Sequence, residues 1–135
     1  MGLDAGVWRN KESIEREFGV GAFMFEPDGS PVATTPEFDR IDSDLLDAAH
    51  EYIGNIGLVG HLRDAVGQLL PQTSAIQRFV LYSGSHCGDH LNAEQIEAVA
   101  RELAAIENSP DLHVQHFVGQ MRRLIAVART ENNPI

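Results

Sequence analysis

The sequence predicts one α+β domain over residues 1–135, with a small mixed or antiparallel sheet of three to five short strands covered by about four helices. Three observations lead to this prediction. Apolar residues alternate with a period of two near the N-terminus and recur with a helical period in the second half, and no repeat relates the two halves. Hydrophobic residues make up 43% of the chain, which is enough to build a core without disulfides.

The N-terminal third is predicted to contain three strands and one short helix. Alternating apolar residues indicate a strand over residues 2–9, and a helix of at most two turns follows over residues 11–18. A second strand over residues 20–26 ends at the Pro-Asp-Gly sequence at 27–29, which favours a tight turn. A returning strand over residues 30–33 would complete a hairpin.

The middle of the chain is predicted to be helical. A polar linker over residues 34–43 leads into a helix over residues 44–53, which Asp and Ser side chains can cap. Glycine then recurs at every third position from 54 to 60, which predicts a break or a close contact between helices. A second helix over residues 58–70 ends before a proline.

The second half is predicted to hold a central strand and two long helices. Residues 78–83 are apolar on both faces, as in a strand buried within a sheet, and a polar loop follows over residues 84–90. An Asn-x-x-Gln capping box starts a helix over residues 92–107, and a Ser-Pro pair starts one over residues 109–129. The last residues, 132–135, read as the beginning of a further strand.

The charge of the chain restricts its partners. It carries 20 acidic and 10 basic side chains, for a net charge of −10, and residues 1–60 alone hold 12 acidic and 4 basic ones. Nucleic acids and anionic membranes would be repelled, so we expect neither as a partner. A basic protein would be attracted. The alternative is that the acidity serves only solubility.

Four aspartates are the best candidates for binding a basic partner, because they cluster before and within the predicted helix over residues 44–53. They are Asp39, Asp42, Asp44 and Asp47. Asp44 and Asp47 are three residues apart, which would place them on one face of that helix.

The polar loop over residues 84–90 holds the densest group of possible metal ligands, namely His86, Cys87, Asp89 and His90. Imidazole, thiolate and carboxylate are the ligands that zinc prefers. A metal-dependent enzyme that uses this loop is therefore the alternative function, with zinc as its cofactor. If the loop binds no metal, we expect no cofactor and no catalytic residue.

The compartment is predicted to be the cytoplasm. A single cysteine excludes an internal disulfide framework. No apolar run reaches the roughly 18 residues that a membrane span needs, and the first residues do not resemble a secretory signal.

Four segments follow a familiar order: Met1-Gly2-Leu3, residues 79–88, the helix over residues 92–106 and the C-terminal residues 124–135. This order resembles small acidic immunity proteins of bacterial polymorphic toxin systems, and uncharacterised bacterial and phage proteins that begin Met-Gly-Leu-Asp, mainly over residues 77–135. The resemblance implies a role in a toxin–antitoxin pair, in which the protein binds and neutralises a toxin. It implies no catalytic residue, and a non-enzymatic binding protein is the favoured function.

Overall fold

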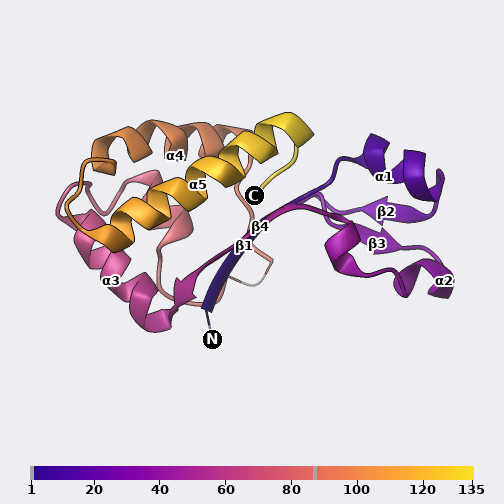
Figure 1. The fold of residues 1–135 in the computed structure, drawn as a ribbon, viewed down its shortest axis with the longest axis horizontal. Helices are drawn as coiled ribbons and strands as arrows, with labels where there is room; N and C mark the ends of the chain where they lie inside the picture. The colour runs from indigo at the N-terminus through magenta and orange to yellow at the C-terminus, as the bar shows by residue number, and fades with distance from the viewer. Residues whose placement is uncertain (1, 87) are drawn as a thin grey trace.

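The structure, a computed structural model, describes residues 2–86 and 88–135. It confirms an α+β fold with antiparallel strands, and within these residues the strands form two separate two-stranded sheets. Figure 1 shows the elements gathered in a helical lobe and a small lobe, which are joined by a long ribbon made of β1 and β4. We use "small lobe" for residues 9–46 and "helical lobe" for residues 56–135.

The ribbon pairs β1 (Gly2–Trp8) with β4 (Asp47–Asn55) in antiparallel register, with irregularities after Leu3 and Val7. The predicted helix over residues 44–53 is therefore wrong. Its weak apolar periodicity is overridden because pairing with β1 runs from one end of β4 to the other, apart from the two irregularities. A short 3-10 turn, η1 (Ser43–Leu45), is the only helical part of that segment.

The small lobe contains α1 (Lys11–Phe18), β2 (Phe23–Phe25), β3 (Pro31–Ala33) and α2 (Pro36–Asp39). The predicted short helix and hairpin are confirmed, and α2 lies inside the expected linker. The lobe has its own core, whose buried members are Ile14, Ala22, Phe23 and Leu46.

The helical lobe packs α3 (Ile56–Gly67), α4 (Ala93–Ile106) and α5 (Leu112–Glu131) around the larger core. The predicted capping box at the start of α4 is confirmed. The predicted start of α5 at Ser109 is wrong, because the Asp111 carboxylate accepts the first free backbone N–H groups and makes Asp111 the N-cap.

The predicted central strand over residues 78–83 is also wrong. Residues Ile76–Val80 form a single π-helical turn, η2. Its first amides are held from another helix, because the two carboxylate oxygens of Glu102 in α4 accept hydrogen bonds from Ala75 N and Ile76 N, both at 2.8 Å. The apolar residues of this segment, such as Ile76 and Val80, are therefore buried in the larger core from a helical turn and not from a strand.

The expected strand at the C-terminus is reduced to one pair of residues. The backbones of Leu91 and Ile135 exchange two hydrogen bonds, at 2.8 and 3.3 Å, and among the described residues no ladder extends beyond this pair. Ile135 packs against the larger core. The end of the chain therefore lies against the loop that precedes α4.

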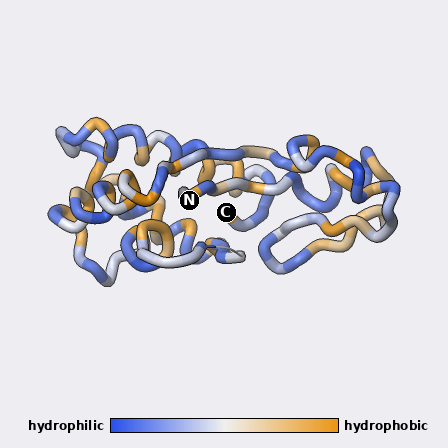
Figure 2. Tube along the Cα trace, turned by 90° about the horizontal axis from the view of Figure 1, so that it is seen from below, coloured by the Kyte–Doolittle hydropathy of each residue, from blue (hydrophilic) through white to orange (hydrophobic). Residues whose placement is uncertain are grey.

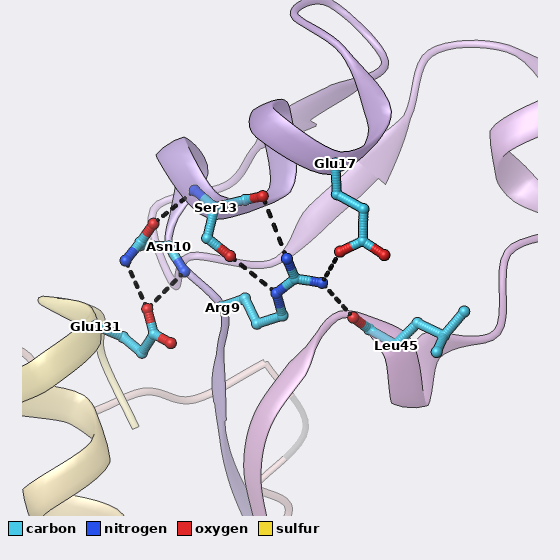
Figure 3. Close-up of polar contacts among 6 residues, drawn as sticks. All are labelled: Arg9, Asn10, Ser13, Glu17, Leu45 and Glu131. Atoms are coloured by element: carbon cyan, nitrogen blue, oxygen red, sulfur yellow. Dashed lines mark hydrogen bonds and ion pairs between the residues drawn. The ribbon is translucent and has the colours of Figure 1, made fainter.

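Polar contacts fasten the small lobe where the ribbon enters it (Figure 3). The Arg9 guanidinium donates to Ser13 and to the Leu45 carbonyl, and it pairs with Glu17 at 2.7 Å. Glu131, at the end of α5, accepts two hydrogen bonds from Asn10. The two lobes are therefore linked by α5 as well as by the ribbon.

Hydrophobic segments occur in both lobes, as Figure 2 shows, and the buried apolar residues form two separate clusters. In the described part of the chain, no helix combines the length and the apolar character needed to cross a bilayer.

Candidate functional site

A cleft of about 570 Å³ lies between the two lobes. The ribbon forms one side of it through β1 and β4. The small lobe adds residues from the β2–β3 turn and from η1, and the helical lobe adds residues from η2, α5 and the loop before α4. The ribbon and both lobes therefore all contribute walls to the cleft.

The ionisable lining of the cleft is acidic. Its described residues include five aspartates and three histidines, with no lysine or arginine among them. The aspartates are Asp4, Asp28, Asp44, Asp47 and Asp89. Apolar and aromatic residues such as Trp8 and Phe79 also line the cleft. Because low-dielectric walls strengthen the field of like charges, the cleft attracts cations.

Two of the four acidic residues predicted to bind a partner, Asp44 and Asp47, line this cleft. Asp42 lies beside them and caps η1, where its Oδ1 accepts a hydrogen bond from Asp44 N at 3.0 Å. Asp39 is exposed at the end of α2 and does not line the cleft. The structure therefore separates the predicted acidic face into a pair inside the cleft and two residues outside it.

Three of the predicted metal ligands, His86, Asp89 and His90, line the same cleft, and Cys87 lies outside the described residues. The His86 ring stacks on Tyr82, with the ring centroids 3.9 Å apart, and its Nε2 lies 2.9 Å from the Tyr82 carbonyl oxygen. The Tyr82 hydroxyl donates to Asp89. Within residues 2–86 and 88–135, no group of three or more His, Cys, Asp or Glu side chains is placed to hold a metal ion.

The surroundings of these groups shift several pKa values. Partial burial raises the pKa of Asp47. The nearby Asp44 raises this pKa further, whereas His50 lowers it. Burial would also raise the pKa of Asp28, but hydrogen bonds from Ser30 and the proximity of His90 outweigh it and lower the pKa. Burial lowers the pKa of His86, which favours the neutral imidazole.

Sequence reasoning missed Asp4, Asp28 and His50 as members of this site. His50 Nε2 lies 3.1 Å from Asp4 Oδ1, across the ribbon from β4 to β1. Once residues 44–53 are assigned to a helix, nothing in the sequence brings Asp4 and His50 together. Asp28 was placed correctly in a turn, but the sequence does not show that this turn faces the helical lobe.

Comparisons of the chain with protein-family models, with curated proteins and with solved structures found no match.

Proposed function

We propose that this protein is a non-enzymatic binding domain that takes a basic segment of a partner protein into the cleft between its lobes. The observation that carries the proposal is the lining of the cleft, with five aspartates and no lysine or arginine among its described residues. A lysine or arginine side chain entering the cleft would meet carboxylates from the ribbon and from both lobes. Such charge-assisted contacts are stronger than hydrogen bonds between neutral groups.

The sequence resemblance to immunity proteins supports a basic toxin as the partner. Neutralisation would require only that the acidic cleft cover a basic surface on which the toxin depends. Asp44 and Asp47 are the residues through which we expect most of the attraction, because both line the cleft where the chain passes from η1 into β4. The proposal assigns no catalytic role to any residue.

Association kinetics at two ionic strengths test this proposal, with a hexa-arginine peptide as the first probe and the partner co-purified from the native host as the second. The double variant Asp44→Asn/Asp47→Asn should slow association and flatten its salt dependence, because charges at a binding surface act mainly on the association rate. The control is Asp64→Asn/Glu94→Gln, which changes the net charge equally at exposed positions outside the cleft.

Equal effects of the two double variants would mean that only net charge matters and would overturn the role of the cleft. A neutral or acidic partner would overturn the electrostatic account, as would an association rate that does not respond to salt. Metal analysis of protein purified without chelators addresses the alternative function. If the loop binds zinc, about one equivalent should be present, and Cys87→Ser should lower both that content and the melting temperature.

A further inference from the structure

A second cavity, of about 450 Å³, lies against α3 on the helical lobe. We call it the α3 groove. Four of its lining residues, Ile56, Val59, Gly60 and Arg63, come from one face of α3, and the start of β1 and residues 82–86 form the rest of its wall. The groove shares Leu3, Asp4 and His86 with the interlobe cleft, but it contains none of the small-lobe residues.

The floor of the groove is apolar and open. Val59 is buried, whereas Ile56 is 75% exposed and offers apolar surface at the edge of the groove. A Cβ placed on Gly60 would meet no heavy atom within 4 Å, so the backbone of α3 itself is accessible there. A ligand could therefore lie closely against the helix at Gly60 and cover Ile56.

Arg63 stands at this apolar wall without an anionic partner. Its side chain is half-buried, and its guanidinium makes no hydrogen bond or ion pair with any residue in the ranges 2–86 and 88–135; only its backbone carbonyl is engaged, by Gln77. Arg9, the other half-buried basic residue described, is fully engaged by Ser13, Leu45 and Glu17. A charge removed partly from water is stabilised by a partner, and Arg63 has none within the described chain.

We propose that the α3 groove binds a small amphipathic monocarboxylic acid. Its apolar body would cover Ile56 and Val59, and its carboxylate would form paired hydrogen bonds with the Arg63 guanidinium. The volume is within the range of small-molecule sites. A single negative charge fits best, because Asp4 and the net charge of −10 repel more highly charged anions such as phosphates.

Titration with octanoate, followed by amide chemical shifts in NMR, tests the proposal. The expected result is a saturable change at residues 56–63 and 82–86. 1-Octanol tests the apolar contribution without charge, and acetate tests the carboxylate without the chain. Arg63→Gln should weaken octanoate binding at least about tenfold while leaving octanol binding unchanged. The exposed Arg101→Gln serves as the charge-matched control.

Gly60→Leu tests the location of the site. The added side chain enters open space, so the variant should fold with an unchanged or higher melting temperature and should lose octanoate binding. Gly57→Leu adds the same side chain to α3 outside the groove and should still bind. The smaller Gly60→Ala should weaken binding less than Gly60→Leu, which provides a second test if the larger variant is unstable.

Three outcomes would overturn the proposal: no octanoate-dependent shifts at the groove, undiminished binding by Gly60→Leu, or equal octanoate affinity for Arg63→Gln and the unmodified protein. The inference is independent of the proposed basic partner. The Asp44→Asn/Asp47→Asn variant should bind octanoate normally, because neither residue lines the α3 groove.

Discussion

The carboxylate of Glu131 accepts hydrogen bonds from both the backbone N–H and the side-chain amide of Asn10, at 3.1 and 2.6 Å. Asn10 is also the N-cap of α1, where its Oδ1 accepts a hydrogen bond from Ser13 N. One oxygen of Glu131 thus orients the residue that starts the first helix of the small lobe. Because these residues stand 121 positions apart, the contact ties the end of the chain to its beginning.

Removing this contact should loosen the small lobe. Glu131→Ala should lower the free energy of unfolding by about 1 to 2 kcal/mol, because two hydrogen bonds to a charged group are lost. Glu131→Gln keeps an acceptor oxygen and should lose less. Chemical denaturation measures the difference, and hydrogen exchange should accelerate in α1 more than in α4. Unchanged exchange in α1 would contradict this role of Glu131.

Glu102 should be needed for the turn η2. Its two oxygens hold Ala75 N and Ile76 N, so Glu102→Ala leaves two amides without their acceptor and should cost about 2 kcal/mol in chemical denaturation. The control is Glu107→Ala, which removes a carboxylate near the end of α4 whose one ion pair within residues 2–86 and 88–135 is with the exposed Arg122. Such an exposed pair contributes little to stability. Equal losses in the two variants would argue against a special role for Glu102.

The raised pKa of Asp47 predicts a pH dependence of stability. Folding favours its neutral form, so as pH falls through this raised pKa the folded protein takes up a proton before the unfolded chain does, and stability increases. Asp47→Asn should therefore raise the melting temperature at about pH 7, and the gain should shrink toward about pH 3, where Asp47 is protonated in both states. The exposed Asp39→Asn is the charge-matched control. A lower melting temperature for Asp47→Asn at neutral pH would contradict the sign of this effect.

Two glycines should respond oppositely to alanine. A Cβ on Gly54 would lie 2.6 Å from Leu58 Cδ2 and 3.0 Å from Leu58 Cβ, so Gly54→Ala should destabilise the fold by about 1 to 3 kcal/mol. Gly60 lies inside α3 beside open space, and Gly60→Ala should stabilise it by about 0.5 to 1 kcal/mol. The melting temperature should fall for Gly54→Ala and rise for Gly60→Ala, relative to the unmodified protein. A stabilising Gly54→Ala would show that Leu58 moves aside without cost.

The features that the sequence predicted correctly depend on neighbouring residues. The start of α4 follows from Asn92 and Gln95, three residues apart, and the hairpin of β2 and β3 follows from the turn between them. The features it missed depend on distant partners. The segment that becomes β4 has weak periodicity of its own and is a strand because β1 pairs with it. The apolar run after Ala75 is a helical turn because Glu102 caps it from α4.

The same distinction applies to the candidate site. The sequence predicted Asp44, Asp47, His86, Asp89 and His90 as members of two separate sites, and the structure places all five around one cleft. Their meeting depends on the ribbon, whose strands are joined through the whole small lobe. No local sequence pattern shows that residues on either side of the small lobe meet at the ribbon. The acidic character of the site could therefore be predicted, but its shape could not.

The pairing of Trp8 with Asp47 has a consequence for the order of folding. Residues 9–46 leave the ribbon and return to it, so the small lobe is topologically an insertion within a β-hairpin. Closing such a long loop costs chain entropy, and this cost is reduced if the insertion folds first and brings its own ends together. In pulsed hydrogen exchange during refolding, we expect β2 and β3 to gain protection before β1 and β4.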